Sequence, residues 1–329
     1  MSLLPDVAKP LEEDEAEAAF GALLDGKIAD EDTAAFLIAL ADRGETAAEV
    51  AGAARAMRAR MIPVEGLQDA IDVCGTGGDG QHSLNVSTAV AIVVAACGVP
   101  VAKHGNRAAS SKAGTADTLE ALGLDLGRAS ALAAQTLPDI GIAFFFAQAH
   151  HPALARLGPV RKALGRRTIF NLLGPLANPA RVTRQLVGVP GPEIVPLYHD
   201  AMQRLGMSRA MIVSGNEGLD ELSISGSSTV ATIGFALPEG AITPDLAGLP
   251  RHDLADLRGG DATYNAAALT RLLMGEPGAY RDAVLLNAAA ALMVAGEVTD
   301  WHMGVEEAAE AIDKGLAKAL LDCWIATTN

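Results

Sequence analysis

The sequence DVCGTGGDG at residues 72–80 joins a short apolar run to a glycine-rich turn. The sequence NVST follows at residues 85–88 and leads into an apolar helical segment. Glycines let backbone N–H groups face a ligand without a Cβ in the way, and the start of the next helix adds unpaired donors and a positive dipole. This order of strand, loop and helix predicts a phosphate-binding loop, although a glycine-rich turn that binds no ligand would have the same sequence pattern.

The loop matches the spacing G-x-G-x-x-G of dinucleotide-binding folds, but its surroundings do not fit that class. A nicotinamide site has an acidic residue about 20 positions further on. Here the next predicted strand leads into Lys103 and His104, and no acidic residue occurs before Asp117. A Walker A loop is excluded as well, because Gly80 is followed by Gln81 rather than by Lys and Ser or Thr.

From residue 70 onward, short β-like runs alternate with helical stretches, which is typical of βαβ units and a parallel sheet. Strands are predicted at residues 70–74, 99–102, 142–146, 185–189 and 209–213. A helix is predicted at residues 87–97, a β-rich stretch at 223–242, and further helical segments at 280–295 and 305–323.

Residues 12–61 have a different, helical pattern, with apolar side chains at three- and four-residue spacing. Asp30 or Asp32 and Thr46 are predicted N-caps, and Gly44 is a predicted C-cap. The predicted fold class is therefore α/β: a small N-terminal all-helical domain at residues 1–68 and a large α/β domain with a mainly parallel central sheet at residues 69–329.

The charge and composition of the chain argue against several classes of binding partner. The net charge of −15 argues against binding of nucleic acid or of an anionic membrane, so any phosphate site must be local. Cys74, Cys97 and Cys323 have no spacing typical of a disulfide framework or a zinc site. The acidic N-terminus is unlike a signal peptide, and the longest apolar runs, at residues 89–97 and 288–295, are too short to span a membrane. A cytoplasmic protein is expected.

Two further segments carry chemistry. The sequence KHGNRAASSKAGT at residues 103–115 gathers cations and hydroxyls in one turn, which suits a pyrophosphate, although a solvated basic turn is the alternative. Asp220 and Glu221 follow an apolar strand in a glycine-flanked turn. Paired carboxylates together with substrate phosphates are a usual site for Mg²⁺, but such a pair can also be solvated surface.

Together these segments resemble the anthranilate phosphoribosyltransferase family. Its motifs are matched by GTGGDG (75–80), NVST (85–88), KHGNRAASS (103–111), VRKALGRRTIFNLLGPLANP (160–179) and GLDE (218–221). The resemblance extends from the helical N-terminus to LNAA at residues 286–289. It implies a homodimer formed through the helical domain, and a central segment, residues 165–184, that returns to that domain.

The resemblance also implies site residues. Those expected at the phosphoribosyl pyrophosphate (PRPP) are Gly75, Gly78, Asp79, Ser83, Asn85, Val86, Ser87, Thr88, Lys103, His104, Gly105, Asn106, Arg107, Ala108, Ala109, Ser110, Ser111 and Thr115. Those expected at anthranilate are Gly75, Asn106 and Arg161. Those expected at the metal, two Mg²⁺ ions of which one arrives with PRPP, are Ser87, Asp220 and Glu221.

The implied reaction is attack of the aniline nitrogen on the anomeric carbon as pyrophosphate leaves, with positioning and charge neutralisation supplying most of the rate. The amine is neutral at pH 7, so no catalytic base is assigned; His104 is the nearest histidine and can equally order its loop. Leu84 and Gln148 depart from the family, which often has Phe and Pro there.

Two other functions remain as alternatives. A nucleoside phosphorylase of related fold would bind free phosphate, and the acidic pair and the segment around Arg161 argue against it. A paralogue that binds nucleic acid would have lost the acidic pair and gained a basic stripe.

Overall fold

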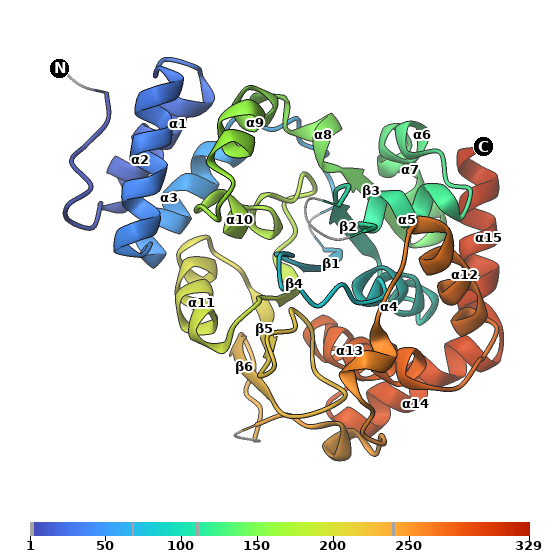
Figure 1. Cartoon of the computed structure of the whole chain (residues 1–329). Coiled ribbons are helices and arrows are strands. Elements are labelled where there is room, and N and C mark those ends of the chain that lie inside the picture. Colours follow the sequence, from blue (N-terminus) through green and yellow to red (C-terminus); the bar gives the residue numbers. More distant parts are fainter. Residues whose placement is uncertain (1–2, 68, 109–111, 239–240) are drawn as a thin grey trace.

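The computed structural model describes residues 3–67, 69–108, 112–238 and 241–329, and its centre is a six-stranded sheet with helices on both faces (Figure 1). Strand order is β3-β2-β1-β4-β5-β6. The strands are β1 (Ile71–Gly75), β2 (Val101–Gly105), β3 (Ile142–Phe146), β4 (Arg184–Gly188), β5 (Arg209–Gly215) and β6 (Ser228–Ile233). All neighbours pair in parallel except β6, which is antiparallel to β5.

The sheet has a topological switch point beside β1. The chain moves outward from β1 to β2 and β3 on one side, and then crosses to β4 and β5 on the other. Ligands of open α/β sheets bind at the carboxyl ends of the strands at such a point. The register aligns Gly75 at the end of β1 with Gly188 of β4, and Gly188 with Val213 of β5. The loops that follow these strands therefore meet at one edge of the sheet.

Side chains of β1 alternate between two cores on the two faces of the sheet, as the two-residue period of a strand requires, and a third cluster contains Ala102 of β2 and Ala143 and Phe145 of β3. Ile71 and Val73 belong to a core shared with α4 (Val86–Ala96) and α13 (Ala279–Ala295). Cys74 belongs to the core on the opposite face, which continues into the helical part of the molecule. The remaining helices from α5 onward are α5 (Thr115–Ala121), α6 (Leu126–Ala131), α7 (Ala133–Ile140), α8 (Ala147–His150), α9 (Pro152–Leu164), α10 (Phe170–Leu173), α11 (Val195–Arg204), α12 (Ala262–Leu273), α14 (Trp301–Asp313) and α15 (Leu316–Thr328).

The helical part comprises α1 (Glu13–Leu24), α2 (Asp30–Arg43) and α3 (Ala47–Arg58), which pack against α9 and α10 (Figure 1). Phe20 is fully buried and packs edge-to-face on Phe36 and on Phe170, with ring centroids 5.8 and 5.7 Å away. Phe170 of α10 thus contributes to the core of the helical part. The boundary between residues 68 and 69 stays a prediction.

The predicted fold class is confirmed, while several element boundaries were wrong. The second strand was predicted at residues 99–102 but extends to Gly105, because Lys103 and His104 are buried inside the sheet. The helical segment 305–323 is two helices, which separate at Gly315 with φ 73°. Thr46 and Gly44 cap helices as predicted. Asp30 and Asp32 do not act as N-caps. They lie in the first turn of α2, where the positive end of the helix dipole stabilises carboxylates.

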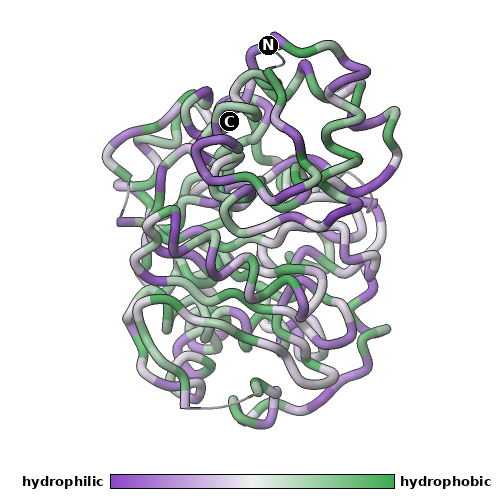
Figure 2. The backbone as a smooth tube through the Cα atoms, turned by 90° about the vertical axis from the view of Figure 1, so that its left-hand side faces the viewer, coloured by the Kyte–Doolittle hydropathy of each residue, from purple (hydrophilic) through white to green (hydrophobic). Residues whose placement is uncertain are grey.

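Hydrophobic and hydrophilic stretches alternate along the chain in Figure 2. Within the described part of the chain, no helix has the length and apolar character needed to cross a membrane.

Candidate functional site

The glycine loop leaves β1 at the switch point and is fixed by backbone hydrogen bonds. Gly77 and Gly78 have φ values of 71° and 76°, a left-handed conformation that glycine adopts without strain. The Thr76 N–H donates to the Gly188 carbonyl at 2.9 Å, and the Gly77 N–H donates to Asp220 Oδ2 at 2.8 Å. The loop is thereby joined to the turn that follows β5.

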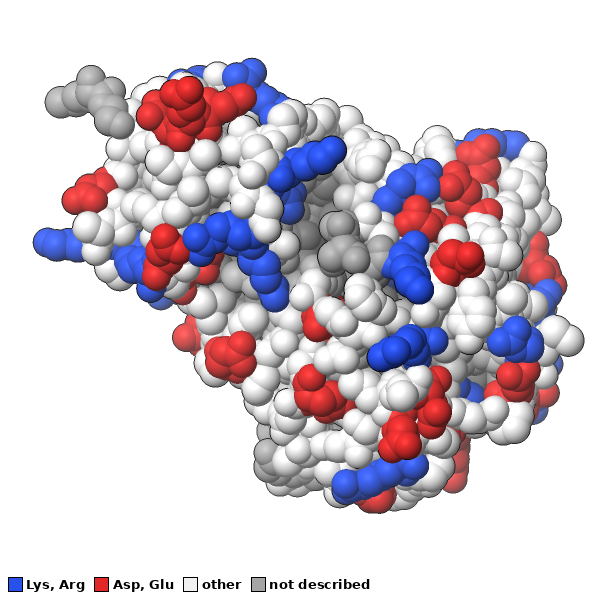
Figure 3. Space-filling view, in the orientation of Figure 1, with Lys and Arg blue, Asp and Glu red and all other residues white. Residues whose placement is uncertain are grey.

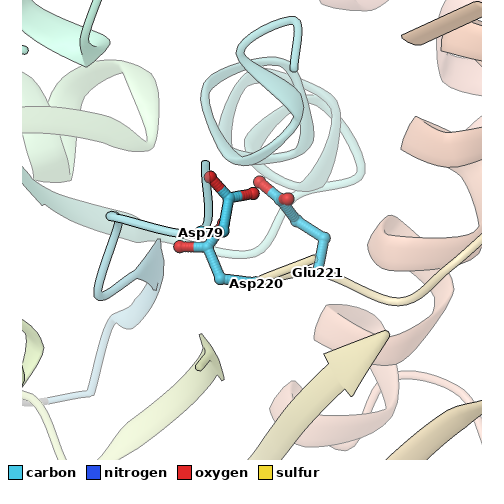
Figure 4. A group of neighbouring side chains, drawn as sticks. All are labelled: Asp79, Asp220 and Glu221. Carbon is cyan, nitrogen blue, oxygen red and sulfur yellow. The ribbon is translucent and has the colours of Figure 1, made fainter. Parts of the chain in front are cut away.

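Three carboxylates meet beside this loop (Figure 4). One oxygen each of Asp79, Asp220 and Glu221 lies within 4.8 Å of the others. Burial, and then the charge of Asp79, raises the pKa of Asp220 to about 7. Burial and the charge of Asp220 raise the pKa of Glu221 well above its usual value. Three acids at such short range repel one another unless a cation or protons lie between them.

The donor chemistry of this acidic cluster fits a magnesium ion. Asp79 Oδ2 and Glu221 Oε2 are buried without a hydrogen-bond partner among the described residues, so each has a lone pair free for a ligand. Magnesium prefers such oxygen ligands and combines one or two carboxylates with substrate phosphates. Asp79 was predicted only as a PRPP residue, and the structure adds it to the acidic pair.

Ser87 in the first turn of α4 lies close to the same acids. It lines a small cavity together with Asp220, Glu221 and Asn287. The Nζ atom of Lys103 lies 3.4 Å from Ser87 Oγ. The structure thus brings together the three residues predicted for the metal, although they come from two distant parts of the sequence.

Lys103 was predicted as a cation for the phosphates, and it lies beneath the loop rather than on the surface. It is 1% exposed, and its Nζ donates to the Val73 carbonyl at 2.6 Å. Burial lowers the pKa of Lys103, and the charges of Asp72, Cys74 and Glu221 oppose this shift. Lys103 therefore stabilises the end of β1 through its hydrogen bond to Val73, and its charge offsets part of the negative charge of Asp72 and Glu221.

A polar network under the site was not predicted from the sequence. Asp72 is fully buried in β1, and its carboxylate accepts from the His104 N–H at 3.2 Å and from Gln185 Nε2 at 3.3 Å. Gln185 Nε2 also donates to the Pro175 carbonyl, and Asn178 Nδ2 donates to the Ala102 carbonyl. These bonds join β1, β2 and β4 to the segment after α10, and only the folded chain brings these residues together.

Asn85, which was predicted at PRPP, forms several hydrogen bonds with distant parts of the chain. Its Oδ1 accepts from Thr118 Oγ1 at 2.6 Å and from Asn265 Nδ2 at 2.9 Å, and its carbonyl accepts from the Tyr280 hydroxyl. Next to it, Val86 is buried in the core and Thr88 Oγ1 lies 3.3 Å from Thr115 Oγ1. Asn85 therefore fixes the turn that enters α4.

Ser83, at the other end of this turn, forms an antiparallel bridge with Arg258. The Leu84 N–H donates to the Leu257 carbonyl, and the Gly259 N–H donates to the His82 carbonyl. This strap of residues 257–259 was not singled out from the sequence. It is hydrogen-bonded to the C-terminal end of the glycine loop, at residues 82–84.

The loop after β2 is held by Asp117, which accepts from the N–H groups of Ala108 and Gly114 at 2.9 Å each. Arg107 pairs with Asp117 and Glu120, and its N–H donates to Asn106 Oδ1. The space beside Gly105 is filled, because a Cβ there would lie 2.9 Å from the Phe144 ring and 3.1 Å from Thr115. Ala109, Ser110 and Ser111, also predicted at PRPP, lie outside the described residues.

Arg161, predicted to contact anthranilate, projects from α9 over the Phe170 ring, with its guanidinium carbon 5.4 Å from the ring centroid. Burial lowers its pKa. In the described ranges it forms no ion pair, so its charge is available to an anionic ligand.

The ring of His104 forms a hydrogen bond with the protein backbone. Its Nδ1 lies 3.1 Å from the Gly174 carbonyl, which can only accept, so this nitrogen carries the proton. The ring of His104 lies 5.2 Å from that of His151. Burial lowers the pKa of His104 to about 3 and the pKa of His151 to about 4. Both rings are neutral at pH 7, and His104 joins the end of β2 to the segment after α10.

We expect His151→Phe to reduce the loss of stability in acid. The unfolded histidine binds a proton near pH 6.5 and the folded one near pH 4, so the unfolded state takes up more protons in this window and stability falls as the pH falls. Wild type should lose about 2 kcal/mol more than the variant between pH 7.5 and 5.0, measured by urea unfolding. Equal losses would contradict a neutral buried His151.

The face that carries these loops is hollowed between the helical part and the α/β part, with Lys and Arg side chains on both rims (Figure 3). Acidic residues are spread over much of the remaining visible surface (Figure 3). Anionic ligands are therefore drawn to the hollow locally, in a chain with a net charge of −15.

Two family models match the chain. The one described as "Glycosyl transferase family, helical bundle domain" matches residues 6–61, and the one described as "Glycosyl transferase family, a/b domain" matches residues 67–318. These ranges follow the helical and the α/β parts of the structure.

Relatives and solved structures match over nearly the whole chain. The anthranilate phosphoribosyltransferase of Novosphingobium aromaticivorans is 65% identical over 99% of each chain. The crystal structure of the enzyme from Thermus thermophilus is 43% identical, covers 98% of this chain and 97% of its own, and has a TM-score of 0.92. The enzyme from Saccharomyces cerevisiae in complex with PRPP and Mg is 29% identical, covers 99% and 96%, and has a TM-score of 0.88. With its glycine loop and acidic cluster in place, the chain belongs to the anthranilate phosphoribosyltransferase family.

Proposed function

We propose that this protein transfers the phosphoribosyl group of PRPP to anthranilate, forming N-(5-phosphoribosyl)anthranilate and pyrophosphate in tryptophan biosynthesis. The observation that carries the proposal is the acidic cluster of Asp79, Asp220 and Glu221 beside the glycine loop, in a chain 65% identical to a named family member. A nucleoside phosphorylase binding only free phosphate would have no use for this cluster.

Magnesium is part of the proposal. Asp79, Asp220, Glu221 and the Ser87 hydroxyl would hold it, and two ions are proposed, one arriving with PRPP. When bound, the metal supplies positive charge that offsets the charge developing on the leaving pyrophosphate. The backbone N–H groups of the glycine loop and the start of α4 add fixed donors at the same edge of the sheet.

The chain's own residues position the two substrates. Arg161 is free to meet the carboxylate of anthranilate, and Asn106 and Gly75 are proposed to line the same subsite. The neutral amine then lies against the anomeric carbon, and as the new C–N bond forms the bond to pyrophosphate breaks. The product nitrogen releases its proton to solvent, so no protein base is required.

Anthranilate fluorescence tests the reaction directly. Purified protein given anthranilate, PRPP and Mg²⁺ should consume the anthranilate signal, and omission of PRPP or addition of EDTA should prevent the loss. Product identity is checked by mass spectrometry. An unchanged signal with all three components present would refute the proposed function.

We also propose a homodimer formed through the helical part and a cytoplasmic location. The family resemblance supports the dimer, and the free thiols of Cys74, Cys97 and Cys323 agree with a reducing compartment. Sedimentation at micromolar concentration should give twice the chain mass of 33.7 kDa; a single species of 33.7 kDa would contradict the dimer.

A further inference from the structure

Arg167 lies over the glycine loop although it belongs to a distant segment of the chain. Gly78 has a left-handed backbone, and a Cβ built on it would approach the guanidinium carbon of Arg167 to 4.0 Å. Among the described residues outside the loop itself, no other heavy atom lies within that distance. The guanidinium therefore faces the backbone turn that leads directly to Asp79.

The segment carrying Arg167 is anchored in the helical part. The helix α9 ends at Gly165, whose φ of 60° turns the chain. Ile169 and Phe170, which follow, are buried in the helical core, and Thr168 is only 4% exposed. Arg167 thus brings a guanidinium from a segment anchored in the helical part close to the glycine loop of the α/β part.

Arg167 forms no hydrogen bond or ion pair in the portion of the chain that the structure describes, whereas its neighbour Arg166 pairs with Asp42 at 2.6 Å. The charge of Arg167 opposes the raised pKa of Glu45, which is caused chiefly by burial. An unpaired guanidinium above a loop that adjoins three acids points to an anionic ligand between them.

We infer that Arg167 is a further ligand of PRPP and binds its pyrophosphate from the helical side. This inference rests on the proposed function. In the proposed function the acidic cluster would hold magnesium together with phosphate oxygens, which would bring the pyrophosphate next to Gly77, Gly78 and Asp79. A planar guanidinium donates two parallel hydrogen bonds to such oxygens, which a lysine cannot do. The backbone of the glycine loop would then hold the pyrophosphate from the side of the sheet, and Arg167 would hold it from the helical part.

Binding experiments on the intact protein without anthranilate test this inference. By calorimetry, Arg167→Gln should weaken binding of PRPP with Mg²⁺ by about tenfold or more, the size of a lost charge-assisted contact. Arg167→Lys should recover part of the loss because it restores the charge but not the paired geometry. Arg166→Gln is the matched control, and it should bind PRPP within about twofold of wild type because its pair with Asp42 is exposed.

Two simpler probes identify the group that Arg167 binds. Inorganic pyrophosphate with Mg²⁺ should bind about tenfold more weakly to Arg167→Gln, whereas ribose 5-phosphate should bind equally to variant and wild type. The KM for anthranilate should change by no more than about twofold.

Unchanged affinity for PRPP and pyrophosphate in Arg167→Gln would overturn the inference. An effect confined to the KM of anthranilate would also overturn it, because the guanidinium would then bind the carboxylate. Failure of wild type itself to bind PRPP would refute the proposed function and the inference with it. Thermal unfolding of each variant, expected to match wild type because Arg167 is exposed, excludes a folding defect.

Discussion

Glu221→Gln is expected to lower kcat/KM for PRPP by at least about a thousandfold at every Mg²⁺ concentration. The substitution keeps the shape of the side chain but removes one of three carboxylates that lie within 4.8 Å of one another. The two remaining acids and the Ser87 hydroxyl would then offer the proposed metal less charge, and the leaving pyrophosphate would lose the neutralisation that the proposed reaction requires. The measurement is the initial rate of anthranilate consumption over a range of Mg²⁺ and PRPP concentrations.

The same variant should be more stable than wild type when metal is absent. The unfolded Glu221 ionises near its ordinary pKa of 4.5, while the folded pKa is well above that value because the side chain is buried beside Asp220. The folded state therefore binds more protons, and wild type loses stability as the pH rises above about 4.5. A glutamine has no charge to bury, so in EDTA at pH 8 the variant should gain on the order of 1 kcal/mol or more in urea unfolding.

A matched control comes from the same turn. Glu217 lies four residues before Glu221, but its carboxylate accepts from the hydroxyls of Ser223 and Ser225 instead of joining the acidic cluster. Glu217→Gln should therefore keep most of the activity and the rise in melting temperature on adding Mg²⁺. Glu221→Gln should lose both. A fast Glu221→Gln enzyme would show that the cluster is not the metal site.

Local sequence was enough to predict most of the fold. Strand 142–146 was placed correctly because IAFFF is apolar throughout and is bounded by Gly141 and a helical stretch. The strand that contains Lys103 was predicted to end too early, at residue 102, because a buried lysine breaks the apolar pattern while its Nζ still donates to the Val73 carbonyl. The spacing of apolar residues indicates which positions are buried. A strand end predicted from this spacing is wrong where a charged side chain is buried because of its contacts with distant parts of the chain.

The site could be predicted in its parts but not in its assembly. The glycine loop and the pair Asp220 and Glu221 each have a readable pattern. The approach of Asp79 to that pair does not, because the two segments are 143 residues apart at the bond between Gly77 and Asp220. The same holds for Asp72, Gln185 and Arg167, because the sequence around each of them does not reveal its contacts in the folded chain. The contacts of Asp72 and Gln185 arise from the sheet order, which places β1 between β2 and β4, whereas Arg167 is positioned by a segment anchored in the helical part.

Gly188→Ala is expected to destabilise the protein by about 3–5 kcal/mol and to abolish the Mg²⁺ response. Gly188 ends β4, and a Cβ there would lie 1.4 Å from the Asp220 carbonyl oxygen and 2.3 Å from its carbonyl carbon. Those atoms are backbone, so the whole turn must move, and it carries Asp220 and Glu221 with it. Urea unfolding and Mg²⁺-dependent melting measure the two effects. Gly127→Ala is the control: its Cβ would meet only Asp125 Oδ1 at 3.4 Å, and stability should change by less than about 1 kcal/mol.

Gly75→Ala separates the two parts of this argument, because it meets the same residue through its side chain. A Cβ on Gly75 would lie 2.2 Å from Asp220 Oδ2 and 3.3 Å from the Asp220 carbonyl oxygen. The carboxylate can rotate away, so the loss of stability should be smaller than in Gly188→Ala. The rotation nonetheless breaks the hydrogen bond from the Gly77 N–H and moves one Asp220 oxygen out of the acidic cluster. Activity should therefore fall as much as in Gly188→Ala. If Gly75→Ala kept full activity, the position of the Asp220 carboxylate could not be what the reaction requires.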